Sequence, residues 1–191
     1  DGSLVLAGLT GTAVRSTDNG QTWSPVSLGV TDGLFAAVRA IDDSLVLAGD
    51  QVIASISPNL GVYPTEPEAD PVGEWLESCA RLEALAREDH LVLPGHKLPF
   101  TGLPQRIAQL ADNHHSALDR LRAFLREPRT AADCFPLLFK RKVDAGTYGL
   151  ALVEAIAHLN HLHRAGEVIR WRRGDDAWLW QMRAASDRLR A

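Results

Sequence analysis

The stretch that decides the fold is "SLVLAGDQVIASISPN", residues Ser44–Asn59. Its first half is a short apolar run typical of a buried strand, and this run ends at Gly49 and Asp50. A second short strand, "HLVLPGH", ends in the same way at Gly95 and His96. Functional side chains gather beyond the strand ends of such sheets, and a carboxylate with an imidazole suits Zn²⁺, Mn²⁺ or Fe. Asp50 and His96 are therefore the candidate metal-binding pair.

The sequence around these two strands indicates helices. A loop over residues 57–71 follows the first strand and is too rich in proline for regular structure. Apolar residues at helical spacing, Leu85 among them, predict an amphipathic helix over 72–87. A long helix is expected from 103 to 125, where Pro128 stops it. The order strand, helix, strand, helix implies a mixed α/β arrangement of layers.

The C-terminal segment, residues 128–191, has the pattern of three helices followed by a hairpin. Thr130 is a candidate N-cap for a short helix over 131–139, and Pro136 is expected to strain the interior of that helix. A longer helix is predicted over 148–164. The strands "EVIRW" and "WLWQ" then flank the turn "RRGDDA". Three helices and a β-wing are the order of a winged-helix domain, which we predict here.

The first 43 residues indicate β-hairpins, and they carry one distinct motif. The string "STDNGQTW" fits the pattern Ser-x-Asp-x-Gly-x-x-Trp with Ser16, Asp18, Gly20 and Trp23. It resembles the Asp-box of sialidase-like and photosystem-assembly-factor-like β-propellers. Asp18 can accept turn amides, Gly20 can take a conformation that other residues adopt at a cost, and Trp23 can cap the hairpin. The resemblance implies a structural role for these four residues and no catalytic one.

The string "SLVLAG" occurs twice, and its two copies lie in different patterns. From Ser3 to Ser44 is 41 residues, which matches the period of a four-stranded propeller blade. The second copy, however, is not followed by another Asp-box. The sequence therefore predicts a chimera joined at the shared string, with an Asp-box hairpin segment over 1–43, an α/β segment over 44–127 and the winged helix over 128–191.

The α/β segment and the tail resemble a metallo-β-lactamase-fold hydrolase. The strings "LVLAGDQVIASISPN" and "LVLPGH", separated by a helix, look like the second half of that fold, and "ALVEAIAHLNHLHRAGEVIRW" looks like a winged-helix domain found in one branch of the superfamily. The resemblance implies a half of the αββα sandwich. It also implies that Asp50 bridges two metals, that His96 binds one of them, and that the metal is zinc, manganese or iron.

The chain departs from that family at its main metal motif. The family's His-x-His-x-Asp-His should lie upstream, yet residues 1–43 contain no histidine. A catalytic zinc generally takes about three protein ligands, and a two-metal site takes more. We therefore assign no catalytic residue, leave the enzyme assignment open, and expect little or no hydrolysis of an ester, thioester or lactam-like small molecule. The alternative is a non-catalytic scaffold or self-association module, which forms a homo-oligomer.

Composition and the remaining polar residues indicate ordinary packing. The net charge is −4, and the two cysteines lack metal-ligand spacing, which favours buried thiols and a cytoplasmic location. No run of about 18 apolar residues occurs, so we expect no membrane span. The predicted helix 148–164 has one arginine, no lysine and one glutamate, so nucleic-acid binding is not expected. We assign packing roles to the histidines and to the aromatic and basic residues of the wing, namely His114, His115, His158, His161, His163, Arg170, Trp171, Arg172, Arg173, Trp178 and Trp180.

Overall fold

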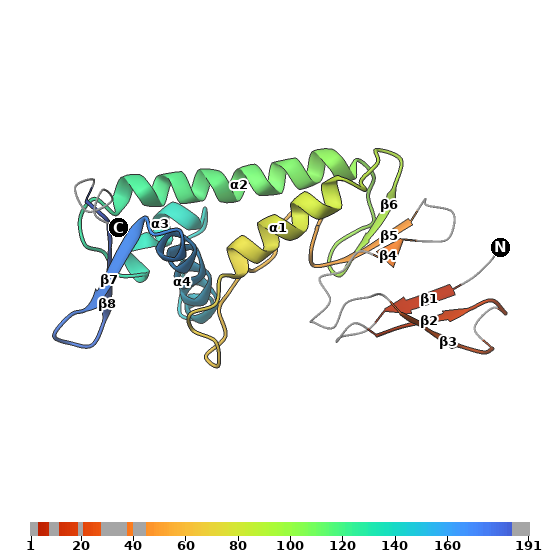
Figure 1. The fold of residues 1–191 in the computed structure, drawn as a ribbon, viewed down its shortest axis with the longest axis horizontal. Helices are drawn as coiled ribbons and strands as arrows, with labels where there is room; N and C mark the ends of the chain where they lie inside the picture. The colour runs from red at the N-terminus through yellow and green to blue at the C-terminus, as the bar shows by residue number, and fades with distance from the viewer. Residues whose placement is uncertain (1–3, 8–11, 19–20, 28–37, 40–44, 185–191) are drawn as a thin grey trace. The chain divides into compact units, whose positions relative to one another are not determined.

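The computed structural model describes residues 4–7, 12–18, 21–27, 38–39 and 45–184 (Figure 1). The chain divides into two compact units, and helices α1 and α2 contribute residues to both. Unit 1 takes its residues from 1–58 and 79–110, and unit 2 from 59–78 and 111–191. The predicted boundaries at 43 and 127 stay predictions.

The N-terminal strands of unit 1 form a small antiparallel sheet. It has the order β1-β2-β3, with β1 over Leu4–Ala7, β2 over Thr12–Ser16 and β3 over Ser24–Ser27. The turn between β2 and β3 contains the Ser16–Trp23 motif, so the hairpin predicted there is confirmed. Between residues 28 and 44 the structure describes only β4, Val38–Arg39.

The second sheet of unit 1 contains the two strands predicted before Asp50 and His96. Its order is β4-β5-β6, with β5 over Leu45–Gly49 and β6 over Leu91–Pro94. Strands β5 and β6 are parallel, and Val46 pairs with Val92. Parallel strands need a long crossover connection, which the chain supplies with the loop and helix α1 between them. Because the strands are parallel, their carboxyl ends lie at the same edge of the sheet.

Helix α1 covers Pro71–Glu83 and begins with a side-chain cap. The Asp70 carboxylate accepts the Gly73 amide at 2.8 Å, and Pro71 takes the first helical position, where its missing N–H is not needed. The helix ends four residues before the predicted end at 87. Leu85 consequently lies beyond it and is 66% exposed, so its predicted place on the apolar face is wrong.

The core of unit 1 lies between β5, β6 and the first turns of α2, which covers Leu103–Phe124. Its fully or almost fully buried apolar residues are Val46, Ala48, Val52, Ile53, Cys79, Val92, Leu103, Ile107 and Leu110. The loop after β6 is fixed to it by reciprocal backbone hydrogen bonds between Val92 and Phe100, at 2.8 and 3.1 Å. The long helix predicted from 103 is confirmed, and the predicted buried thiol of Cys79 is confirmed as well.

Unit 2 is built from the second part of α2 and three further helices. A 3-10 turn, η2, covers Ala132–Cys134, helix α3 covers Phe135–Leu138 and helix α4 covers Tyr148–Arg164. They enclose one apolar cluster, whose fully buried members include Leu121, Leu125, Cys134, Ala155, Leu159, Leu162 and Val168. The expected strain at Pro136 is absent, because the chain starts a new helix there and Pro136 lies in the first turn of α3.

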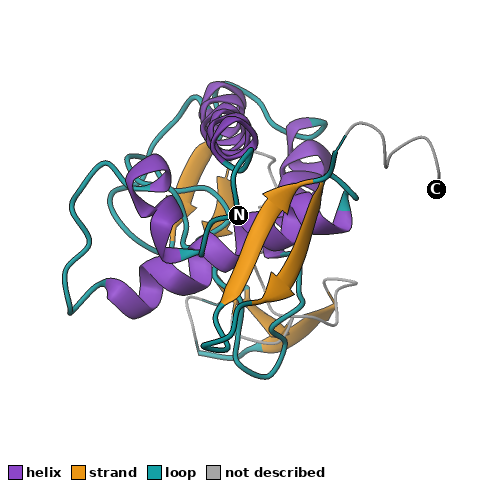
Figure 2. Cartoon of the chain, turned by 90° about the vertical axis from the view of Figure 1, so that its left-hand side faces the viewer, coloured by secondary structure: helices purple, strands orange, loops and turns teal. Residues whose placement is uncertain are grey.

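A hairpin closes unit 2 (Figure 2). Strand β7, Val168–Arg172, pairs antiparallel with β8, Trp178–Met182, as the sequence predicted. Trp180 is 2% exposed and its backbone exchanges hydrogen bonds with Arg129 at 2.8 and 2.9 Å. The order of helices and hairpin is the predicted one, and its assignment to a winged helix stays a prediction. In the part of the chain that the structure describes, no helix is long and apolar enough to cross a membrane.

Candidate functional site

Asp50 and His96 meet at the carboxyl edge of the β5–β6 pair. Asp50 follows the last residue of β5, and His96 lies two residues after the end of β6. His96 Nδ1 and Asp50 Oδ1 are 2.7 Å apart, a hydrogen-bond distance. The side chains are 66% and 37% exposed, respectively, so both can be reached from solvent. The two residues that the sequence selected are therefore brought into contact by the parallel register.

Two glycines make this approach sterically feasible. Gly49 has φ +50°, a left-handed conformation that costs little for glycine, and it turns the chain out of β5. The Gly95 amide donates to the Gly49 carbonyl at 2.7 Å, which joins the two strand ends. A Cβ atom added to Gly95 would lie 2.7 Å from Asp50 Oδ1, closer than real Cβ contacts allow. Glycine at position 95 is thus the residue that leaves room for the Asp50 carboxylate.

The segments on either side of the pair are held in place. Gln51 is buried and donates from Nε2 to Cys79 Sγ at 3.3 Å, and desolvation raises the pKa of that thiol to about 11. Arg106 of α2 donates to the carbonyls of Ile53 at 2.7 Å and of Ile56 at 3.0 Å. Lys97, next to His96, has φ +73°, a conformation that costs a non-glycine residue about 1 kcal/mol. The fold therefore keeps a strained residue directly beside the candidate ligand.

The hydrogen bond determines what His96 offers chemically. A carboxylate only accepts, so the proton in the Asp50–His96 contact resides on Nδ1, and Nε2 of a neutral ring carries the lone pair. A carboxylate that orients an imidazole in this way commonly supports a metal-binding nitrogen. A divalent metal can be held by both side chains only where it takes the place of the Nδ1 proton. A metal at Nε2, on the far side of the ring, would have His96 as its ligand and Asp50 as the group that orients His96. The two side chains do not complete a site: among the described residues, no group of three or more His, Cys, Asp or Glu side chains could hold a metal ion.

Two histidines contact each other in unit 2, and the sequence did not predict this contact. His114 of α2 and His158 of α4 are 4% and 2% exposed, and His114 Nδ1 is 3.1 Å from His158 Nε2. His158 Nδ1 lies 2.8 Å from the Glu154 carbonyl and must donate to it. His158 Nε2 is then an acceptor, so His114 donates from Nδ1. His114 Nε2 is left as a buried acceptor without a partner among the described atoms.

Burial determines the charge state of this second pair. Desolvation, followed by repulsion from His158 and His115, lowers the pKa of His114 to about 4. Desolvation also lowers the pKa of His158. The Trp75 ring lies against His114 with centroids 5.0 Å apart. Both rings are accordingly neutral near pH 7, and their role is packing, as predicted for histidines of these helices.

The described residues of the Ser16–Trp23 motif form local hydrogen bonds. Asp18 Oδ1 accepts the Thr22 amide at 2.8 Å and the Ser16 hydroxyl at 2.7 Å. These hydrogen bonds, led by one from the Thr22 hydroxyl, lower the pKa of Asp18 to about 2. Trp23 is 37% exposed, and Gly20 lies outside the described residues. Derivation of this hairpin from a propeller stays a prediction.

The remaining polar residues selected from the sequence have structural partners. His161 Nδ1 is 3.1 Å from both carboxylate oxygens of Asp70, the N-cap of α1, and His163 Nδ1 is 2.8 Å from the Val168 carbonyl. On the hairpin, Arg170 pairs with Glu68 and stacks over the rings of Trp178 and Trp180. Arg172 and Arg173 pair with Asp176 and Asp175. These contacts agree with the packing roles predicted for both groups.

Comparison with known proteins identifies a related family and related structures. Residues 118–183 match the family described as "Metallo-beta-lactamase-like, C-terminal domain". The chain is similar to a beta-lactamase domain protein from Burkholderia ambifaria, with 39% identity, a TM-score of 0.73, and coverage of 77% of this chain and 44% of that one. It is also similar to a metallo-beta-lactamase family protein from Thermus thermophilus, with 29% identity, a TM-score of 0.64, and coverage of 80% and 46%. Comparison with curated proteins gives no match.

These likenesses confirm part of the sequence interpretation. The mixed α/β, metallo-β-lactamase-like fold is confirmed, and the C-terminal segment is a metallo-β-lactamase-like C-terminal domain by its family match. The chain spans less than half the length of the two solved structures.

Proposed function

We propose that the chain from Ser44 onward is the second half of a metallo-β-lactamase-superfamily hydrolase, in which Asp50 and His96 ligate the metal. The observation that carries this proposal is the 2.7 Å contact between the two side chains at the ends of parallel strands β5 and β6. The likeness to two solved structures of that superfamily supports it.

A divalent metal at this pair would act as a Lewis acid and lower the pKa of a bound water. The substrate class that follows is a small molecule with an ester, thioester or lactam-like bond. Without a metal, Asp50 accepts a hydrogen bond from the His96 proton at Nδ1. A metal ligated by both side chains would take the place of that proton. Gly49 turns the chain out of β5, and the missing side chain of Gly95 leaves room for the Asp50 carboxylate.

We further propose that these 191 residues alone hydrolyse little or nothing. Asp50 and His96 supply two donors, and about three protein ligands are usual for a catalytic zinc. Two donors leave a metal mostly hydrated and weakly held. On this account the pair is part of a site whose other ligands come from a different segment, as the upstream histidine motif of the superfamily implies.

A zinc titration followed by ¹H–¹⁵N NMR tests the proposal. We expect weak, saturable shifts at the backbone amides of residues 49–51 and 95–97, together with a shift of the His96 ring nitrogen signals. His96→Ala and Asp50→Asn should each abolish the shifts of these amides. His161→Ala is the matched control, because His161 also contacts a carboxylate, Asp70, but outside this pair. Zinc shifts that survive both substitutions would refute the assignment.

Self-association is the second candidate, and exposed apolar side chains of unit 1 favour it. Leu85, Leu91 and Leu98 are 66%, 44% and 79% exposed. Apolar side chains of this size at a surface are compatible with an interface. Sedimentation velocity at rising concentration tests this alternative: a monomer throughout would refute it, and a dimer that Leu91→Lys or Leu98→Lys dissociates would support it.

A further inference from the structure

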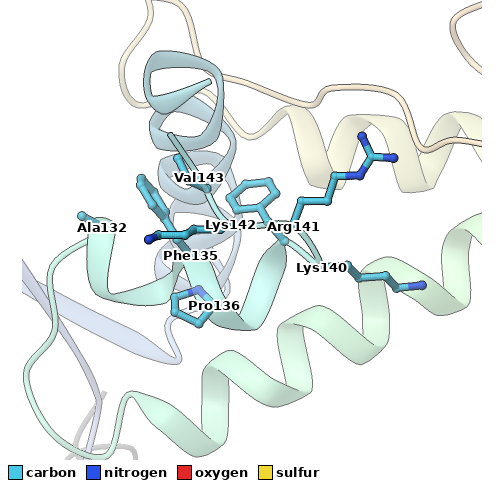
Figure 3. Close-up of a pocket in the computed structure, with 8 residues that line it drawn as sticks. Ala132, Phe135, Pro136, Lys140, Arg141, Lys142 and Val143 are labelled. Atoms are coloured by element: carbon cyan, nitrogen blue, oxygen red, sulfur yellow. The ribbon is translucent and has the colours of Figure 1, made fainter. Parts of the chain in front are cut away.

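A hollow in unit 2 lies outside every feature assigned so far. It has a volume of 490 Å³ and opens between α3 and the loop that follows it (Figure 3). Its apolar wall consists of Ala132, Phe135, Pro136, Phe139 and Val143. The other lining residues are three consecutive cations, Lys140, Arg141 and Lys142. A volume of this size is in the range of sites for small organic ligands.

The three cations differ from several other basic residues of unit 2, which are neutralised by carboxylates. Arg122, Arg170, Arg172 and Arg173 each pair with a carboxylate. In contrast, Lys140–Lys142 form no ion pair with any residue that the structure describes. A run of like charge without counter-ions is a site of positive potential, to which an anion is attracted.

Asp144, two residues after Lys142 in the sequence, is already engaged by its own turn. Asp144 Oδ1 accepts the Thr147 amide at 2.9 Å and the Thr147 hydroxyl at 2.8 Å, and these bonds lower the pKa of Asp144. Thr147 Oγ1 also accepts the Asp144 amide at 3.1 Å. This reciprocal turn fixes the chain immediately before α4. Asp144 therefore holds the loop in shape and does not reach the lysines.

A hydrogen bond from α2 and aromatic contacts fix the position of the apolar wall. Arg120 of α2 donates to the Leu137 carbonyl at 2.9 Å, which anchors the end of α3. Phe135 packs edge to face with Phe139, at 5.9 Å and 72°, and with Tyr148, at 5.4 Å and 71°. The two phenylalanines of the apolar wall thus belong to a preformed aromatic cluster with Tyr148, which does not itself line the hollow. Phe139 is half-buried, so its ring remains accessible from the hollow.

The three cations have different positions around this wall. Lys142 extends across the hollow beside Phe135 and Ala132, whereas Lys140 and Arg141 extend outward from its rim (Figure 3). Lys142 is therefore the cation placed to meet a ligand whose apolar part contacts the phenylalanines. Lys140 and Arg141 can add contacts to any charge that projects beyond the rim.

We propose that this hollow binds a small anion that combines a planar ring with phosphate groups, such as a nucleotide. The ring stacks on the aromatic wall, where apolar contact and aromatic packing favour a flat, weakly polar group. The phosphate pairs with Lys142 and is further bound at the rim, where the Arg141 guanidinium offers two parallel donors. The site is formed by unit 2 alone and does not depend on the Asp50–His96 pair.

Titration of the chain into N-methylanthraniloyl-ADP, with the emission of the probe as readout, tests this proposal. We expect a Kd of about 10–100 µM, ordinary for a small ligand with a few polar contacts. ATP should displace the probe. Adenosine and inorganic tripolyphosphate, which carry the ring and the phosphates separately, should each compete at least roughly tenfold less well, as expected for one lost set of contacts.

Substitutions locate the binding to this hollow. Lys142→Gln should weaken binding about tenfold, as expected for loss of one charge-assisted hydrogen bond, and Lys140→Gln should weaken it less. Phe139→Leu keeps the wall apolar but removes one ring, and it should weaken ATP binding while leaving tripolyphosphate binding unchanged. Arg126→Gln, an equal charge change at an exposed site outside the hollow, is the matched control and should have no effect.

Three results would overturn the proposal. The first is no probe binding by the wild-type chain. The second is binding that Lys142→Gln and Arg126→Gln reduce equally, because that would be non-specific attraction to charge. The third is tripolyphosphate competing as well as ATP with no effect of Phe139→Leu, since the aromatic wall would then make no contact.

Discussion

The Asp50–His96 pair and the His114–His158 pair place a histidine side chain in opposite environments. His96 is 66% exposed and contacts a carboxylate, whereas His114 is 4% exposed and contacts a second imidazole. His96 lies at a strand end beside a strained backbone, and His114 lies between helices against Trp75. The exposed pair keeps a nitrogen lone pair accessible to solvent and ions. The buried pair has its lone pair enclosed in the packed interior of unit 2.

This difference indicates which pair can perform chemistry. An exposed imidazole oriented by a carboxylate can exchange a proton for a metal ion at little structural cost. A buried imidazole pair cannot gain a charge without placing an uncompensated ion in an apolar interior, which is unfavourable. Conversely, the buried pair should contribute more to folding stability, and the exposed pair should contribute almost none.

Replacement of one histidine of each pair by alanine gives the largest expected difference in the free energy of unfolding. His158→Ala leaves a cavity, removes the acceptor of His114 and leaves the Glu154 carbonyl without that donor, so we expect a loss of about 3 kcal/mol in the free energy of unfolding. His96→Ala removes a mostly exposed side chain and should change that free energy by less than about 0.5 kcal/mol. Urea denaturation followed by tryptophan fluorescence and circular dichroism measures both. Equal losses of unfolding free energy in the two variants would contradict the contrast between the buried and the exposed pair.

The pH dependence of stability gives the next largest effect. Since the pKa of His114 is about 4 in the folded chain and near 6.5 when unfolded, the unfolded state binds more protons between these values. Stability is therefore full above pH 6.5 and falls on acidification, by about 2 kcal/mol down to about pH 5 for this histidine. The free energy of unfolding, measured by urea titration at several pH values, reports this slope.

A substitution separates this slope from other titrations. Burial raises the pKa of Glu154 to about 7, and its protonation in the folded state acts in the opposite direction over much of the same range. His114→Gln cannot take up a proton, so it should flatten the acid slope by about one proton while Glu154 is unchanged. His96→Gln is the exposed control and should leave the slope as it is. A wild-type slope in His114→Gln would contradict the buried, neutral assignment.

Steric crowding at Gly95 should cost less stability than the changes at the buried pair and should have a clear effect on the exposed pair. In Gly95→Ala the new Cβ forces the Asp50 carboxylate away, and we expect a loss of about 1 kcal/mol together with a mixed tautomer of His96. Ring ¹⁵N chemical shifts report that tautomer. Gly174→Ala, where a Cβ meets open space, is the control. A His96 ring that keeps Nδ1 protonated in Gly95→Ala would show that Asp50 does not orient it.

The Asp50–His96 pair could be predicted from the sequence because its position depends on two short sequence patterns. Two apolar runs, each closed by a glycine and a polar residue, predict parallel strands with Asp50 and His96 at one edge, and the β5–β6 register brings them to 2.7 Å. Helices α2 and α4 were likewise predicted within one or two residues, because their periodicity is long and regular. The prediction of a single helix over 131–139 with strain at Pro136 is wrong, because a proline at the start of a new helix has the same sequence pattern as a proline inside one.

The buried pair and the hollow could not be predicted in the same way. His114 and His158 lie 44 residues apart on different helices, and no spacing rule links them. Their contact depends on how α4 packs against the second part of α2. The sequence periodicity of each helix does not determine this packing. The hollow similarly depends on the angle between α3 and the loop after it. The run Lys140–Lys142 was visible in the sequence, but the aromatic wall beside it was not.

Metal content is the measurement that tests the central claim most directly. Elemental analysis of the wild-type chain, purified and dialysed without a chelator, should find well below one zinc, manganese or iron per chain, because Asp50 and His96 provide two donors only. Esters and thioesters should then remain unhydrolysed. About two metal ions per chain, lost in Asp50→Ala and accompanied by turnover that the same substitution abolishes, would contradict the claim that this chain holds only part of a metal site.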